Sequence, residues 1–154
     1  MNVVFLLVPK CDVTYLPLRS SLRQAFETLR AHNHNEIPVV DEEGHYCGTV
    51  STSDLLNFVY DHNLPAIHEL EDYPISLIMD QDSNPPLTVN AEFSELLNRL
   101  QDQNFVAVID DRDLFTGIIT RKVVMTFLKK RWEYPNLRAS SLHQDATKRY
   151  SPLD

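Results

Sequence analysis

Two short polar segments stand where an apolar stretch of the chain ends and a helical pattern begins. One is Ser51-Thr52-Ser53-Asp54, and the other is Thr120-Arg121-Lys122. A hydroxyl just before a helix can bond a phosphate or ribose oxygen, because the N–H groups of the helix N-terminus favour an anion there. An Asp three residues later can accept hydrogen bonds from a ribose diol, and an arginine can hold a phosphate through two donors. The two segments therefore favour non-covalent binding of a nucleotide.

Both segments also have simpler explanations. Ser and Asp are preferred at helix starts whatever the ligand, so Ser51 and Asp54 could serve only as a helix cap. Arg121 and Lys122 could lie on a solvated surface. Two cations at a helix start oppose the helix macrodipole, however, and a bound phosphate would offset that conflict.

The other polar clusters predict neither catalysis nor a metal site. His32 and His34 alternate in a predicted loop, but no Cys or carboxylate stands at ligand spacing from them. The acidic run 110–113 lacks the glycine and the terminal Glu of a calcium loop, and it is typical of a hairpin turn. The chain has only three glycines and no Ser/His/Asp or His-Glu-x-x-His arrangement. We therefore expect no catalytic residue, no metal and no cofactor.

Composition limits the classes of binding partner and the cellular compartment that we expect. The 154 residues carry a net charge of −8 and a pI of about 5.1, which argues against general binding to nucleic acid or to an anionic membrane. The apolar stretch Val3–Val8 is far too short for a membrane span, which needs ~20 residues. Cys11 and Cys47 show no CxxC spacing, and no signal peptide is recognised. This usage is typical of ordinary thiols in a reduced, cytoplasmic protein.

The chain also repeats itself. Residues 37–48 and 106–117 each contain an apolar strand, an Asp, a polar turn and a Gly that opens a second strand, in register at an offset of 69 residues. Such a repeat determines the architecture before any other feature. We predict a first copy over residues 1–62, a linker over 63–76 and a second copy over 77–132. The polar tail over 133–154 is expected to be mobile.

Each copy is predicted to hold a helix, two strands and a second helix. Ser20 or Ser21 is expected to cap the first helix, and Asn90 its counterpart in the second copy. Strands are predicted at 37–40, 47–50, 105–109 and 115–119, antiparallel within each copy because short polar loops join them. The last helix is predicted over 121–131. The stretch 75–79 is expected to begin the second copy as a short helix.

These runs resemble a CBS domain. The first copy reads Ile-Pro-Val-Val-Asp at 37–41 and Gly-Thr-Val-Ser-Thr-Ser-Asp at 48–54, and the second reads Val-Ala-Val-Ile-Asp at 106–110 and Gly-Ile-Ile-Thr-Arg-Lys-Val at 117–123. The resemblance covers residues 3–131. It implies an α/β (α+β) fold in which two CBS repeats, each a small sheet flanked by helices, pack with pseudo-twofold symmetry. It also implies an adenine nucleotide bound between the repeats and pairing of two chains as a homodimer.

In this family each ligand site joins strand residues of one copy to the helix start of the other. Carried over, site A consists of Thr14, Leu16, Asn35, Ile37, Thr120, Arg121 and Lys122. Site B consists of Leu87, Val89, Asn104, Phe105 and Val106 with Ser51 and Asp54. Val123 stands in site A where the ribose-binding Asp is expected, so site A suits a ligand rich in phosphate and poor in ribose hydroxyls. Cyclic di-AMP fits that description.

The run Gly-Ile-Ile-Thr-Arg-Lys-Val-Val at 117–124 is similar to a narrower group, the small stand-alone CBS proteins of Gram-positive bacteria that bind cyclic di-AMP. The resemblance implies a non-enzymatic sensor that controls a partner protein. Asp12 and Glu36 depart from the group, because two carboxylates near the predicted pocket would repel phosphates. An AMP-, ADP- or ATP-binding regulator and a ligand-free dimerisation or interaction module therefore stay open as alternatives.

Overall fold

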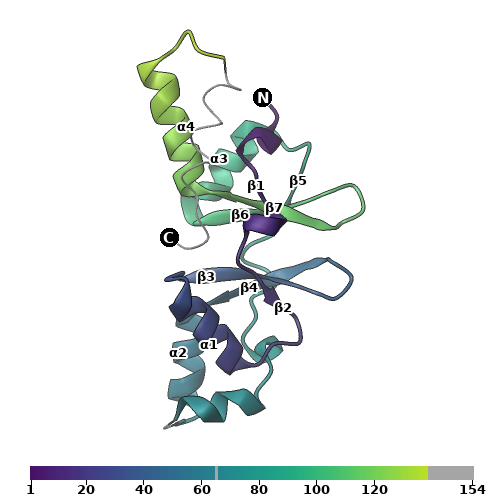
Figure 1. Cartoon of the computed structure of the whole chain (residues 1–154), viewed down its shortest axis with the longest axis vertical. Helices are drawn as coiled ribbons and strands as arrows, with labels where there is room; N and C mark the ends of the chain where they lie inside the picture. Colours follow the sequence, from purple (N-terminus) through teal and green to yellow (C-terminus); the bar gives the residue numbers. More distant parts are fainter. Residues whose placement is uncertain (65, 139–154) are drawn as a thin grey trace. The chain divides into compact units, whose positions relative to one another are not determined.

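The chain folds into two compact units, which a computed structural model describes over residues 1–64 and 66–138. We call residues 14–85 the first-copy unit. The second-copy unit combines residues 1–13 with the described residues from 86 to 138. Both units mix helices with a small sheet, so the predicted α+β class and the two small sheets flanked by helices are confirmed (Figure 1).

The first-copy unit is built on a three-stranded sheet in the order β2-β3-β4. Strand β2 (Leu16–Pro17) runs parallel to β3 (Glu36–Val40), which pairs antiparallel with β4 (Tyr46–Ser51). Helix α1 (Leu22–Ala31) joins β2 to β3, and α2 (Thr52–Asp61) follows β4 directly. Two 3₁₀ helices, η3 (Ile67–Asp72) and η4 (Ile75–Leu77), complete the unit.

The second-copy unit repeats this order and adds one strand. Its four-stranded sheet runs β1-β7-β6-β5, with β5 (Leu87–Thr88) parallel to β6 (Phe105–Ile109) and β6 antiparallel to β7 (Phe115–Thr120). Helices α3 (Phe93–Asp102) and α4 (Arg121–Glu133) correspond to α1 and α2. The remaining elements come from the N-terminal segment: η1 (Val3–Leu6), β1 (Val8–Pro9) and η2 (Lys10–Asp12). The predicted antiparallel hairpins are confirmed in both copies.

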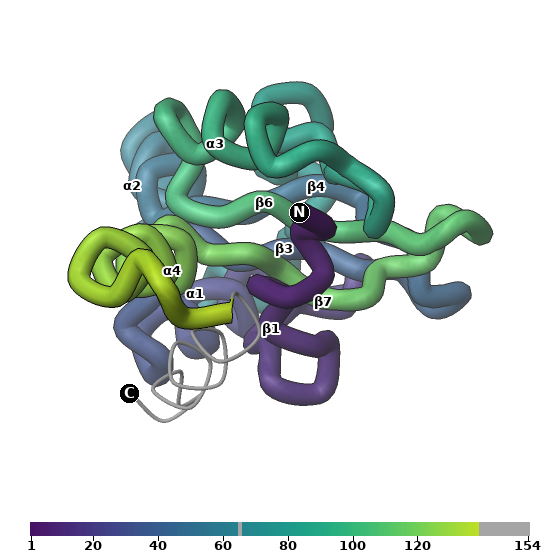
Figure 2. The backbone as a smooth tube through the Cα atoms, turned by 90° about the horizontal axis from the view of Figure 1, so that it is seen from above, coloured from purple at the N-terminus to yellow at the C-terminus, as the bar shows by residue number. Residues whose placement is uncertain are grey.

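A segment that precedes each copy in the sequence completes the sheet of the other copy. Strand β1 pairs antiparallel with β7, Val8 opposite Ile118 (Figure 2). In the first-copy unit, Thr49 and Asp80 exchange two backbone hydrogen bonds of 2.9 Å. The incoming segments pass over Gly48 and Gly117, where a Cβ would overlap the carbonyl oxygens of Asp80 and Val8. Only glycine therefore fits at the two equivalent positions.

This exchange explains why the units do not follow the predicted boundaries of 1–62, 63–76 and 77–132. Residues 1–13 belong with the second copy, because β1 pairs with β7. The predicted linker lies largely inside the first-copy unit, where Leu70 and Ile75 are buried in the hydrophobic core. Ile75–Leu77 is a short helix as expected, but it closes the first-copy unit instead of opening the second. Of the predicted tail, residues 139–154 lie outside the described residues.

The helix starts follow capping chemistry in three cases out of four. Ser21, not Ser20, caps α1 in a capping box with Gln24, because each side chain accepts from the other's backbone N–H. Ser51 and Thr120 cap α2 and α4. Asn90 was the wrong residue for α3, which begins after Glu92 with no side-chain hydrogen bond at the cap. No helix within the described ranges is both long and apolar enough to cross a membrane.

Candidate functional site

Both predicted polar segments lie at a corner where the last strand of a sheet turns into a helix. In the first-copy unit the corner is formed by Glu36 paired with Ser51 at the end of β4. The Ser51 hydroxyl accepts from the Asp54 N–H at 3.1 Å, and the Asp54 carboxylate accepts from the Ser51 N–H at 3.0 Å. This capping box confirms the helix-cap interpretation of both residues.

The second-copy corner has the same geometry with different side chains. Phe105 pairs with Thr120 at the end of β7, and the Thr120 hydroxyl accepts from the Val123 N–H at 3.1 Å. The first N–H of each helix donates to an asparagine carbonyl at 2.9 Å, from Thr52 to Asn35 and from Arg121 to Asn104. No acidic residue lies in the first turn of α4. The positive end of this helix is therefore not compensated by a carboxylate of its own.

Each corner contains residues of site A and residues of site B. Within the first-copy unit, Asn35 and Ile37 of site A lie beside Ser51 of site B, because β3 starts where β4 ends. Within the second-copy unit, Phe105 and Val106 of site B likewise lie beside the site A residue Thr120. This pairing of half-sites follows directly from the antiparallel register.

The apolar site residues lie mostly in the cores of their units. Leu16 and Ile37 are 2% and 1% exposed and belong to the first-copy core, while Phe105 and Val106 are buried in the second-copy unit. These side chains therefore pack inside their own units. The Val89 N–H is already bonded to the Ile109 carbonyl at 3.1 Å. Thr14 is half-buried, and Asn35 and Lys122 are exposed.

Arg121 has a structural role that the sequence did not reveal. Its guanidinium donates to the Leu100 carbonyl through Nε at 3.0 Å and to the Gln103 carbonyl through Nη2 at 2.9 Å, with a longer bond of 3.4 Å to Gln101. These carbonyls form the C-terminal end of α3, where unpaired C=O groups carry negative potential. The arginine thus caps α3, and this contact offsets the unfavourable position of the cation at the start of α4.

The first copy caps the corresponding carbonyls in another way. After α1 the backbone N–H of His34 donates to Leu29 and that of Asn33 to Arg30, at 3.1 and 3.3 Å. Asn33 has a φ of +50°, so this is the left-handed turn that commonly ends helices. Four residues separate α1 from β3, but only two separate α3 from β6. The second copy lacks room for this turn, and the Arg121 side chain takes its place.

Glu36, one of the two unexpected carboxylates, is held by its own unit. Its carboxylate accepts from the side-chain amide of Asn84, which also donates to the Thr49 hydroxyl at 2.9 Å. The Tyr46 hydroxyl donates to the Asn84 carbonyl at 2.8 Å, and burial raises the pKa of this phenol. The charge of Glu36 is therefore fixed in place near the first-copy corner. Asp12 lies exposed in η2.

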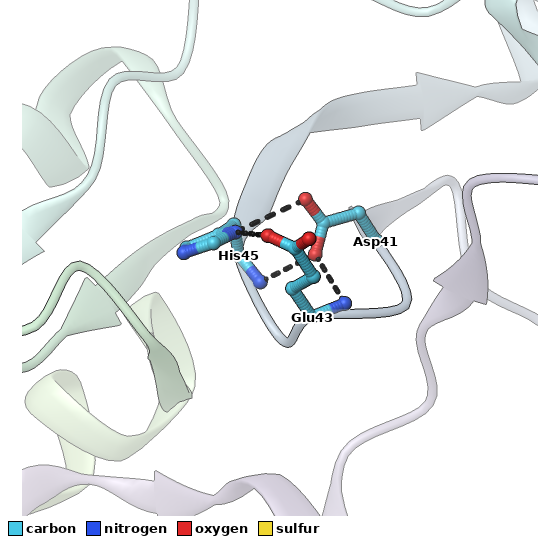
Figure 3. Close-up of side chains that lie close together, drawn as sticks. All are labelled: Asp41, Glu43 and His45. Carbon is cyan, nitrogen blue, oxygen red and sulfur yellow. Dashed lines mark hydrogen bonds and ion pairs between the residues drawn. The ribbon is translucent and has the colours of Figure 1, made fainter.

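One cluster has the composition of a cation site. Asp41, Glu43 and His45 lie around the β3–β4 turn with one ligand atom each within 4.8 Å of the others (Figure 3). Asp41 Oδ1 accepts from the N–H groups of Glu43 and His45 at 2.9 and 2.8 Å, and these bonds, chiefly the one from His45, lower the pKa of Asp41. The His45 ring lies 3.2 Å from Asp41 Oδ2. The close grouping is thus accounted for by hydrogen bonds.

The second copy supports this interpretation of the turn. Asp110 makes the same two bonds, to the N–H groups of Arg112 at 2.8 Å and Leu114 at 2.9 Å. Arg112 and Leu114 stand where the first copy has Glu43 and His45, so the turn forms without the other two candidate ligands. The predicted hairpin turn at 110–113 is therefore confirmed. Burial raises the pKa of Cys47 and lowers that of His34, which disfavours a reactive thiolate and a charged imidazole.

The profile of the CBS domain matches residues 7–61. The second copy repeats the element order and register of the first, and the chain is similar in fold to tandem CBS structures. One of these, CbpB in complex with c-di-AMP, has a TM-score of 0.76 at 24% identity and covers 97% of this chain and 91% of that one.

Two further similar proteins are a cyclic di-AMP receptor and a protein crystallised with c-di-AMP. Cyclic di-AMP receptor B of Bacillus subtilis is 25% identical over 118 residues, which cover 77% of this chain and 80% of the receptor. The CbpB protein of Listeria monocytogenes, crystallised with c-di-AMP, is 27% identical with a TM-score of 0.69, covering 86% of this chain and 96% of that one. The resemblance to cyclic di-AMP-binding CBS proteins is therefore confirmed.

Proposed function

We propose that this CBS-domain protein is a non-enzymatic, cytoplasmic sensor that binds an adenine nucleotide between its two copies and controls a partner protein. Cyclic di-AMP is the leading ligand, because two relatives of matching length are a receptor for it and a protein crystallised with it. Ligand binding regulates a partner only if the nucleotide has unequal affinity for two states of the sensor. We further propose that the working form is a homodimer.

The observation that carries this proposal is the start of α4. Thr120 caps the helix, Arg121 and Lys122 follow, and no carboxylate stands in the first turn. The helix N-terminus and the two cations together favour a phosphate. By contrast, the first turn of α2 contains Asp54. Site A is thus the better anion site of the two, and we assign the ligand to it.

Within site A, we assign the phosphate contact to Lys122 and not to Arg121. The Arg121 guanidinium is already bonded to carbonyls at the end of α3. Lys122 is exposed, and in the described part of the chain its ammonium group makes no ion pair. Thr14, Leu16, Asn35 and Ile37 are proposed to contact the nucleotide chiefly through backbone groups and the polar side chains.

A second candidate function rests on Asp54. The carboxylate of Asp54 uses one oxygen in the capping box, so its other oxygen can still accept from a ribose hydroxyl. AMP, ADP or ATP would satisfy site B, formed by Ser51, Asp54, Val89, Phe105 and Val106. The alternative of a ligand-free interaction module is favoured instead by the mutual capping of Ser51 and Asp54, which leaves the corner complete without a ligand.

Calorimetric titration with cyclic di-AMP, AMP and ATP tests these proposals. We expect cyclic di-AMP to bind, and Lys122→Ala to weaken it about tenfold, the loss of one charge-assisted contact. Arg112→Ala, at the exposed tip of the β6–β7 turn, is the matched control and should bind like the wild type. Binding of AMP that is lost in Asp54→Ala would move the ligand to site B. Binding of none of the three nucleotides would leave the interaction module as the function.

A further inference from the structure

A polar network surrounds Glu36 on one face of the first-copy sheet. Glu36 and Thr49 lie on the face opposite Ile37 and Val50, whose side chains belong to the hydrophobic core. The Asn84 side-chain amide donates to the Glu36 carboxylate and, at 2.9 Å, to the Thr49 hydroxyl. One uncharged amide therefore fixes the position of the carboxylate.

The negative charge of Glu36 has no paired cation. In the described part of the chain, Glu36 forms no ion pair. Residues 14–85 contain no lysine and only three arginines. Arg19 and Arg23 pair with other carboxylates, and Arg30 lines the groove between α1, α2 and η3. The first-copy corner therefore holds a fixed and uncompensated negative charge.

The second copy forms the same corner without this network. At the repeat offset of 69 residues, Phe105 stands where the first copy has Glu36, and Ile118 replaces Thr49. Both hairpins nevertheless have the same antiparallel register, with an irregularity at the equivalent place. The fold therefore does not require the network, so we looked for its role at the ligand site.

The charge lies within the first-copy half of site A. Glu36 stands between Asn35 and Ile37, two residues assigned to that site, and opposite Ser51 at the corner. We propose that Glu36 makes site A selective for nucleotides whose phosphates are diesters, and that Asn84 positions the carboxylate for this purpose. The inference rests on the proposed function, because it concerns the ligand of the same site.

The selectivity follows from the charges of the candidate ligands. A phosphodiester carries one negative charge, whereas a terminal phosphate loses a second proton near pH 6 and carries about two charges at pH 7. Cyclic di-AMP therefore carries about two charges and ATP about four. A carboxylate about 8 Å from one such charge in water lowers affinity about twofold. Two additional charges should therefore favour the cyclic ligand over ATP by about fourfold.

Calorimetric titration of the Glu36→Gln variant measures this selectivity. We expect the ratio of the Kd for ATP to the Kd for cyclic di-AMP to fall about fourfold from the wild-type value. The amide oxygen can still accept from Asn84, so only the charge is lost. Glu42→Gln, on the exposed turn, should keep the wild-type ratio. An unchanged ratio in Glu36→Gln would overturn this inference alone, whereas absence of binding by either nucleotide would overturn the proposed function as well.

A second variant tests the positioning role of Asn84. In the wild-type background, Asn84→Ala should lower the same ratio, because the freed carboxylate can turn into solvent. In the Glu36→Gln background the substitution should leave the ratio unchanged, since no charge remains to be positioned. A merely structural role would lower the melting temperature in both backgrounds without moving the ratio, and that result would remove Asn84 from the proposal. Circular dichroism checks that each variant is folded.

Discussion

The Arg121 guanidinium donates to the Gln103 carbonyl at 2.9 Å and so connects the start of α4 to the end of α3. With its bond to Leu100 it caps carbonyls that the first copy caps with a left-handed turn at Asn33. The difference comes from the loop length, since the second copy has two residues fewer at this point. Arg121, which the sequence predicted as a phosphate ligand, thus has a structural role in the fold.

Arg121→Ala should lower the free energy of unfolding by about 1–2 kcal/mol, the cost of charge-assisted hydrogen bonds at a partly exposed site. Urea denaturation measures this loss. Lys122→Ala is the matched control on the same helix and should stay within about 0.5 kcal/mol of the wild type. If Arg121→Ala instead left stability unchanged and abolished cyclic di-AMP binding, the guanidinium would be a ligand group.

Gly48→Ala and Gly117→Ala should each destabilise the protein by roughly 2–4 kcal/mol. The new Cβ would overlap the carbonyl of Asp80 or Val8, and the φ values of 151° and 155° strain any side chain. The exchanged segment would have to leave its sheet. Thermal unfolding monitored by circular dichroism reports the loss, and Ser94→Ala on the exposed surface of α3 should change little. Equal stability of the Gly117→Ala variant would contradict the β1–β7 contact.

Glu36→Gln should raise the affinity for cyclic di-AMP if the nucleotide occupies site A. The amide oxygen can still accept from Asn84, so only the negative charge is removed. A charge about 8 Å from a phosphate in water opposes binding by roughly 0.5 kcal/mol, about a twofold effect. Calorimetry compares this variant with Glu42→Gln on the exposed turn, which should bind like the wild type. A weaker complex for Glu36→Gln would mean that the carboxylate contacts the ligand.

Stability should fall as the pH drops below about 6.5, the ordinary pKa of histidine. Burial, and secondarily the charge of His32, lowers the pKa of His34 in the folded state. The unfolded chain therefore binds a proton more readily, and this part of the stability is lost between the unfolded and the folded pKa. Denaturation midpoints across this range should decline less for His34→Gln than for the wild type. Equal slopes for His34→Gln and the wild type would contradict this contribution of His34.

Periodicity and capping chemistry were sufficient to predict most of the local structure. The strand pairs and α4 appear where the apolar runs and Thr120 placed them, because neighbouring residues determine hairpins and helix caps. Asn90 failed as a cap because α3 starts two residues later, after Glu92. The predicted boundaries of the copies differ from the bounds of the structural units for another reason. Val8 and Ile118 pair across 110 residues of chain, and no local pattern encodes such a partner.

The sequence by itself therefore determined the repeat, its register and the two strand-to-helix corners at Ser51 and Thr120. These features are local. The two-residue period of strands, the 3.6-residue period of helices and the preference of hydroxyls for helix starts can be recognised without knowing the fold. Only the tertiary structure decided which segment completes each sheet and what Arg121 binds. Those outcomes depend on which distant carbonyls are left without a donor once the elements have packed, and that is a property of the folded unit.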